Sequence, residues 1–165
     1  MTRPIPEAGV DLLRAAAQVD VWSEPLAPPR DELLRLVQGR AGLLVLPSER
    51  IDEELLDAAG PSLLVVSSFS VGFEHFDVAA CARRGVACGH TPGVLTETTA
   101  DTAWALMMAA ARRLSEAERY VRADRWATGG IDDLIGVDIN GATLGIIGLG
   151  RIGQAVARRA RGFGM

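Results

Sequence analysis

The stretch Ala142-Thr-Leu-Gly-Ile-Ile-Gly-Leu-Gly-Arg-Ile-Gly-Gln-Ala-Val-Ala157 decides the fold of this chain. It is typical of a strand over Thr143–Ile147, then a glycine turn and a helix. The glycines Gly148, Gly150 and Gly153 fit the pattern G-x-G-x-x-G, which marks a dinucleotide-binding turn in βα units. There the first glycine allows the tight bend, the second lets a pyrophosphate approach the backbone, and the third lets the helix pack against the strand.

The same turn carries Arg151, whose guanidinium can add a charged contact to a phosphate. A purely structural glycine turn is the alternative, but the β-branched strand before it and the helix after it favour nucleotide binding, with the phosphates at the helix N-terminus. The residue that separates NAD from NADP follows such glycines by about 20 positions, which is past Met165. We therefore expect NAD or NADP as the cofactor, with no preference between them.

The region before this turn alternates between helical and strand patterns. Helices are predicted over 7–19, 30–37, 52–59 and 77–84, and strands over 19–22, 42–46, 63–67 and 86–88. Continuous apolar strands that alternate with helices indicate a parallel sheet with both faces covered, and therefore an α/β fold. The breaker-rich segment 89–93 then predicts a boundary.

A long apolar helix is predicted after this boundary. Thr98 and Asp101 have the spacing of a capping box at its start. A more polar helix is predicted over Glu116–Trp126, and a loop over Thr128–Gly141 precedes the glycine turn.

Composition restricts the partners. The 165 residues carry a net charge of −4, which argues against nucleic acid or an anionic membrane as the main partner. The start lacks the apolar region of a signal peptide, and the most apolar helical stretch, 103–111, is too short to span a bilayer. We therefore expect a cytoplasmic protein. Cys81 and Cys88 form no metal-binding pattern and are expected to be small buried or half-buried thiols, so no metal site is predicted.

Few other residues have a pattern typical of chemistry. The loop Ser67–Gly72 follows an apolar strand, where backbone N–H groups can hold a carboxylate, but an ordinary strand-to-helix loop is equally consistent with it. His75 and His90 lack a carboxylate placed beside them in the sequence, so we expect them to be structural or exposed rather than catalytic. Asp77 is expected to cap a helix.

Three motifs together resemble the D-isomer-specific 2-hydroxyacid dehydrogenase family, and the match is closest to its glyoxylate/hydroxypyruvate reductase group. The first is Ser70-Val-Gly-Phe-Glu-His-Phe-Asp77. The second is Thr91-Pro-Gly-Val-Leu-Thr-Glu-Thr-Thr-Ala-Asp101 with Ala109-Ala-Ala-Arg-Arg113. The third is Gly141–Ala155, which contains the glycine turn. The resemblance covers nearly the whole chain, in the order found in the family.

The resemblance implies an architecture and a set of site residues. Residues 1–91 would form a parallel-sheet, flavodoxin-like substrate domain, and residues 92–165 the incomplete start of a Rossmann dinucleotide-binding domain. By the same likeness Val71 and Gly72 would offer backbone N–H groups to the substrate carboxylate. Gly150, Arg151 and Ile152 would lie at the cofactor pyrophosphate with Gly148 and Gly153 of the same turn, and Thr98 would lie near the nicotinamide. The helix from Thr98 would contribute to a homodimer.

The family's activity is NAD(P)H-dependent reduction of a 2-oxo acid, here glyoxylate or hydroxypyruvate, to the 2-hydroxy acid. Its catalytic arginine, glutamate and histidine follow the glycine turn in the family, and none can be assigned to this sequence. We therefore expect this chain to be an N-terminal fragment, without its first strand and inactive by itself. A non-catalytic dinucleotide-binding or dimerisation module of the same fold is the alternative.

Overall fold

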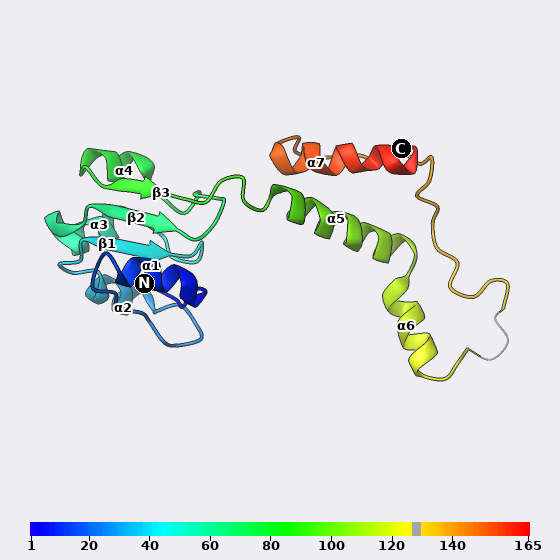
Figure 1. Cartoon of the computed structure of the whole chain (residues 1–165), viewed down its shortest axis with the longest axis horizontal. Helices are drawn as coiled ribbons and strands as arrows, with labels where there is room; N and C mark the ends of the chain where they lie inside the picture. The colour runs from blue at the N-terminus through cyan, green and yellow to red at the C-terminus, as the bar shows by residue number, and fades with distance from the viewer. Residues whose placement is uncertain (127–129) are drawn as a thin grey trace. The chain divides into compact units, whose positions relative to one another are not determined.

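The computed structural model describes residues 1–126 and 130–165, which form two compact units, Met1–Val94 and Leu95–Met165 (Figure 1). The start of the predicted loop at 128–141 lies outside the described residues. None of the described helices combines the length and the apolarity that crossing a membrane requires.

The first unit contains a three-stranded parallel sheet in the order β1-β2-β3 (Figure 1). Its strands are β1 (Gly42–Val45), β2 (Val65–Ser68) and β3 (Ala87–Gly89). In the register, Val66 lies opposite Leu43 on one side and Cys88 on the other. The α/β class with a parallel sheet, predicted from the alternating apolar segments, is confirmed.

Four α-helices accompany this sheet: α1 (Glu7–Arg14), α2 (Arg30–Leu36), α3 (Glu53–Ala59) and α4 (Val78–Arg83), with a short 3-10 helix η1 (Gly60–Ser62) after α3. Two of them begin at a capping aspartate. Asp52 accepts the amide N–H of Leu55 at 3.1 Å, and Asp77 accepts that of Ala80 at 2.8 Å. Each carboxylate satisfies a donor that the first helical turn leaves free. The predicted cap at Asp77 is confirmed.

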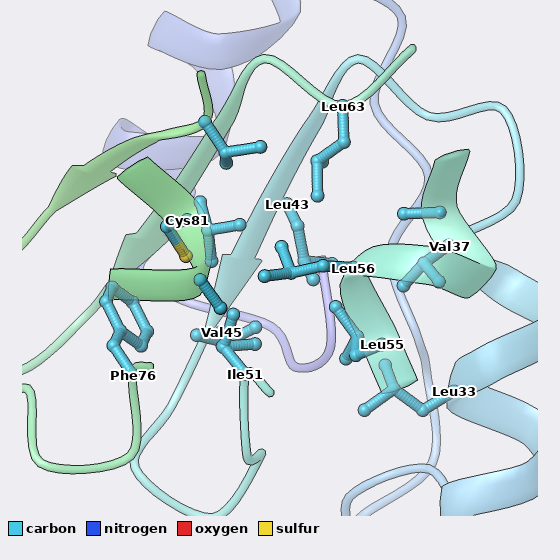
Figure 2. Packing of buried hydrophobic residues seen from close by; sticks show 14 residues of the cluster. Leu33, Val37, Leu43, Val45, Ile51, Leu55, Leu56, Leu63, Phe76 and Cys81 are labelled. Carbon is cyan, nitrogen blue, oxygen red and sulfur yellow. The ribbon is translucent and has the colours of Figure 1, made fainter. Parts of the chain in front are cut away.

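The main core lies on one face of the sheet. Alternate residues of β1 and β2, among them Leu43, Val45 and Val66, point to that face and are buried. Side chains from α2, α3 and α4 close over them, as Figure 2 shows for the labelled residues Leu33, Leu55 and Cys81. This period-two burial follows from the pleat of a strand, which sends successive side chains to opposite faces.

The other face of the sheet is only partly covered by the described residues. Val65 is 41% exposed, and Leu64, just before β2, is 64% exposed. The prediction that both faces are covered is therefore wrong for β2. The apolar residues Leu64 and Val65 favour burial on this side too, but the described residues cover them only in part.

The second unit consists of α5 (Thr96–Ala111), α6 (Leu114–Arg122), α7 (Arg151–Ala160) and the short 3-10 helix η2 (Arg161–Phe163). Its smaller core contains Trp104, Ile139 and Ala160. Trp104 on α5 donates its indole N–H to the Val156 carbonyl on α7 at 3.0 Å. This contact joins two helices that lie far apart in the sequence.

Two predicted strands, 19–22 and 143–147, are not formed. A strand depends on hydrogen bonds to a neighbouring strand. The backbone groups of Asp20 and Trp22 hydrogen-bond to a single residue, Met1. Two hydrogen bonds to one residue are too few to form a strand ladder. Ile147, in the second segment, is fully exposed, and no described residue pairs with 143–147.

The predicted capping box at Thr98 is also wrong. Helix α5 begins at Thr96, and the Thr98 hydroxyl donates back to the Leu95 carbonyl at 3.2 Å. Asp101 instead pairs with Arg159 of α7 at 2.6 Å. A contact between distant segments has replaced the local cap.

Candidate functional site

The glycine turn before α7 has the backbone geometry that its pattern predicts. Gly148 has a φ of 91°, a left-handed conformation that residues with a side chain rarely adopt. A Cβ on Gly153 would lie 2.1 Å from the Gly148 carbonyl oxygen, so no side chain fits there. A Cβ on Gly150 would meet nothing within 4 Å, so the backbone at this position faces open space.

The N-terminus of α7 presents unpaired donors beside that open space. Gly150 precedes the helix without any side-chain cap, and the first hydrogen bond inside the helix runs from the Gln154 N–H to the Gly150 carbonyl at 2.9 Å. The N–H groups of Arg151 and Ile152 therefore have no acceptor within the helix. Together with the positive end of the helix dipole, such N–H groups can hold an anionic group such as a phosphate.

Ion pairs fix α7 against α5. Arg159 contacts Glu97 at 2.9 Å and Asp101 at 2.6 Å, and Arg158 contacts Glu97 at 2.7 Å. The hydrogen bonds to Asp101 and then Glu97 raise the pKa of Arg159 above its ordinary value. Thr98 is exposed and lies next to Glu97 in the first turns of α5. It belongs to the same unit as the glycine turn. The structure thus brings Thr98 and the predicted phosphate-binding residues into one compact unit.

The loop after β2 is organised by a chain of side-chain hydrogen bonds. The hydroxyls of Ser68 and Ser70 lie 2.6 Å apart, and Ser70 Oγ donates to the Gly72 carbonyl at 2.7 Å. His75 Nε2 lies 3.0 Å from Ser68 Oγ. Sequence patterns did not indicate this network, because it depends on the loop folding back so that His75 meets the end of β2.

Burial affects the charge of this histidine. Desolvation lowers the pKa of His75 below its ordinary value, against the opposing charges of Glu74 and Glu49. A neutral imidazole can donate a hydrogen bond to a serine hydroxyl or accept one from it, so this contact requires no buried charge. The lowered pKa of His75 therefore favours the neutral imidazole in this network.

The second histidine supports the same loop from its other side. His90 Nδ1 lies 2.9 Å from the Val71 carbonyl, and its ring meets Phe73 edge-on with the centroids 5.1 Å apart. Among the residues that the structure describes, neither His75 nor His90 hydrogen-bonds to a carboxylate. Both contacts agree with the predicted structural role.

The loop leaves two backbone donors free. Val71 and Gly72 are half-buried, and no acceptor for either amide N–H occurs within 1–126 and 130–165. Partly buried amides without a partner are uncommon, because they lose hydration without replacement. Two such donors in succession at the end of a parallel strand can hold a carboxylate. Val71 and Gly72 belong to the first unit, and the glycine turn belongs to the second.

A parallel α/β unit followed by a glycine turn at a helix start is the arrangement typical of a class of nucleotide-binding α/β proteins. The chain belongs to the D-isomer specific 2-hydroxyacid dehydrogenase family, whose catalytic-domain sequence model matches residues 1–158. The predicted resemblance is confirmed by this match.

Two similar curated proteins are named as reductases. The chain is 48% identical over its full length to a glyoxylate reductase of Thermococcus kodakarensis and covers 50% of that protein. It is 45% identical to a human protein named glyoxylate reductase/hydroxypyruvate reductase, again over its full length, and covers 51% of it. The chain thus spans about half the length of the curated relatives it matches.

Solved structures share the fold. A crystal structure of a Thermus thermophilus protein superimposes with a TM-score of 0.92 at 45% identity, over 99% of this chain and 52% of the other. A D-lactate dehydrogenase of Aquifex aeolicus, crystallised with NAD and lactic acid, gives a TM-score of 0.77 at 27% identity, over 98% of this chain and 47% of the other.

Proposed function

We propose that the whole protein to which this chain belongs reduces a short 2-oxo acid, glyoxylate or hydroxypyruvate, to the 2-hydroxy acid with NADH or NADPH. The observation that carries the proposal is that two pairs of backbone N–H groups, at 71–72 and at 151–152, have no acceptor among the described residues. The curated relatives named glyoxylate reductase support the choice of substrate class.

The loop after β2 has the features that a substrate carboxylate requires. The N–H groups of Val71 and Gly72 would donate to its oxygens, and the Ser70 hydroxyl and His90 imidazole hold the two carbonyls of the same residues. The donors are thereby pre-oriented, which reduces the cost of ordering them when substrate binds. Residues 1–91 are accordingly proposed as the substrate domain.

The N-terminus of α7 would hold the cofactor. Arg151 and Ile152 would donate backbone N–H groups to the pyrophosphate, and the missing side chain of Gly150 would let it approach. A bound nicotinamide dinucleotide supplies the hydride for the reduction. We assign residues 92–165 to the nucleotide domain, with Thr98 toward the nicotinamide and α5 as part of a homodimer interface.

We further propose a cytoplasmic location and no nucleic-acid or membrane partner, in accord with the net charge of −4. This chain alone is proposed to be inactive. Reduction of a 2-oxo acid requires a proton donor, and both histidines are held in the loop network, where neither hydrogen-bonds to a carboxylate among the described residues. Losing a general acid costs about 10²–10⁴-fold in rate.

A chimera tests the proposal. This chain is joined to the second half of the Thermococcus kodakarensis glyoxylate reductase, and NADPH or NADH oxidation is followed with glyoxylate, hydroxypyruvate and pyruvate. We expect turnover of at least one 2-oxo acid by the chimera and none by this chain alone. A folded chimera with no turnover on any of the three acids would contradict the proposal.

Two variants of the chimera assign the two sites. Gly72→Val should raise KM for the oxo acid by about tenfold or more and leave KM for the cofactor unchanged. Gly150→Val should raise KM for the cofactor and leave KM for the oxo acid unchanged, because the valine side chain would enter the open space beside α7. Gly162→Ala is the matched control, since a Cβ there also meets nothing within 4 Å. An identical effect of both test variants on both KM values would refute the assignment.

A further inference from the structure

The two free backbone donors of the loop after β2 belong to successive peptide groups. The N–H of Val71 shares a peptide group with the Ser70 carbonyl, and the N–H of Gly72 shares one with the Val71 carbonyl. The described residues contain no cis peptide bond. In a trans peptide group, which is planar, the N–H points away from the C=O. Whatever holds these two carbonyls therefore also sets the directions of the two N–H groups.

Both carbonyls are held by one short segment, His90–Thr91, directly after β3. The Thr91 N–H donates to the Ser70 carbonyl at 2.8 Å, and His90 Nδ1 lies 2.9 Å from the Val71 carbonyl. All of these residues belong to the first unit. Because adjacent residues hold both carbonyls, both carbonyls point toward the same segment, and both N–H groups point away from it.

This orientation differs from that of a strand. In a strand, the N–H groups of successive residues point to opposite neighbours. In this loop, the N–H groups of Val71 and Gly72 point to the same side, and neither has an acceptor among residues 1–126 and 130–165. Two successive donors on one side can bind both oxygens of a single carboxylate.

The contact from His90 also fixes which of its ring nitrogens carries a proton. A carbonyl oxygen can only accept a hydrogen bond, so the Nδ1 of His90 must be the donor. The ring meets Phe73, a residue of the same loop, edge-on with the centroids 5.1 Å apart. His90 is otherwise exposed, so these two contacts with the loop orient its ring.

We propose that His90 is a positioning residue for the substrate carboxylate. In its Nδ1–H form it holds the Val71 carbonyl and so aims the Gly72 N–H, while the Thr91 N–H aims the Val71 N–H in the same way. A hydrogen bond accepted by a carbonyl also polarises its peptide group, which makes the N–H of that group a stronger donor. The inference rests on the proposed function, which makes these two N–H groups the carboxylate site.

Two measurements test this role. On the chain alone, the ¹⁵N chemical shifts of the His90 imidazole show which nitrogen is protonated, in alkaline buffer where an ordinary imidazole is neutral. In the chimera with the second half of the Thermococcus kodakarensis protein, His90→Leu removes the donor, and His90→Asn is the matched variant that keeps a side-chain N–H. The kinetics give kcat, KM for the oxo acid and KM for the cofactor.

We expect the proton on Nδ1. His90→Leu should raise KM for the oxo acid about five- to tenfold, the effect of one lost hydrogen bond, with KM for the cofactor unchanged. His90→Asn should change KM for the oxo acid by less than about twofold, because its amide can still hold the Val71 carbonyl.

A proton on Nε2 with Nδ1 bare would overturn the inference, because His90 could then not hold the carbonyl. An equal rise in KM for the Leu and Asn variants would also overturn it, since the shape of the ring and not its donor would then matter. A chimera without turnover on any oxo acid would contradict the proposed function instead, and the ¹⁵N shifts of the chain alone would still decide whether His90 donates to the loop.

Discussion

The indole of Trp104 stacks on the phenyl ring of Phe163, with the ring centroids 4.6 Å apart and the planes inclined by 12°. The stack joins α5 to η2, directly after α7. Trp104 is 6% exposed, and its N–H is satisfied by the Val156 carbonyl. A buried tryptophan with its polar atom paired contributes its full apolar surface to the core. This one side chain therefore supports the helix whose N-terminus is the proposed phosphate site.

Replacing this tryptophan should destabilise the chain strongly. We expect Trp104→Ala to lower the free energy of unfolding by about 3–5 kcal/mol, because it leaves a cavity and removes the stack. Trp126→Ala is the control, since that side chain is 60% exposed. Urea unfolding followed by circular dichroism measures both. Equal losses in the two variants would show that the Trp104 contact does not stabilise the unit.

The cap of α3 offers a second test. Asp52 accepts the Leu55 N–H and pairs with Arg30. We expect Asp52→Ala to cost about 1 kcal/mol and Asp52→Asn less, because an asparagine still caps a helix. Asp31→Ala, on the exposed first turn of α2, is the matched control. Urea midpoints at constant m-value give the comparison, and an Asn variant as unstable as the Ala variant would mean that the ion pair, not the cap, dominates.

The same carboxylate should make the stability of the chain depend on pH in the acid range. Burial alone would raise the pKa of Asp52, but the Leu55 N–H and the Arg30 guanidinium outweigh it, and the pKa lies below the ordinary 3.8. A lowered folded pKa stabilises the fold above the unfolded value and is lost as pH falls through the folded value. We therefore expect the difference in Tm between the chain and Asp52→Asn to shrink below about pH 4. A constant difference down to low pH would contradict this.

His75 should add a second pH dependence, near neutrality. Burial holds its pKa below 6.5, so the unfolded chain binds this proton more tightly than the folded one. The stability that this provides is present above about pH 6.5 and is lost as pH falls through the lower folded pKa. His75→Gln should flatten the Tm profile in that window. Parallel profiles for the chain and His75→Gln would count against the network.

The two cysteines should differ in reactivity. Cys81 is fully buried, and burial together with Cys88 raises its pKa to about 12. Cys88 is exposed on β3. A disulfide reagent should modify one thiol in the native chain and the second only after unfolding, and Cys88→Ser should remove the fast phase. Two thiols that react together in the native chain would show that Cys81 is accessible.

The sequence predicted those elements that local chemistry determines. Apolar runs gave the three strands of the sheet, and Asp77 was identified as a cap because its carboxylate needs only the next helical turn. The glycine spacing predicted the bend at Gly148 and the close approach at Gly153, since backbone conformation and volume impose both.

Features that depend on distant partners were not predictable in this way. The segments 19–22 and 143–147 have strand composition, but hydrogen-bond partners decide whether a strand forms. Asp101 has the spacing of a capping residue but pairs with Arg159, 58 positions later. The Ser68–His75 contact joins the end of a strand to a loop that folds back on it, and periodicity carries no signal for it.

The most direct test of the account is a titration of the chain with NADH and NADPH, followed through its backbone amide resonances. We predict shifts concentrated at Gly150, Arg151 and Ile152, where the N-terminus of α7 offers unpaired donors, and their loss in Gly150→Val. The Gly162→Ala control should respond like the unaltered chain. Unchanged resonances at these three amides at saturating nucleotide, or equal binding by Gly150→Val, would contradict the assignment of this turn as the cofactor site.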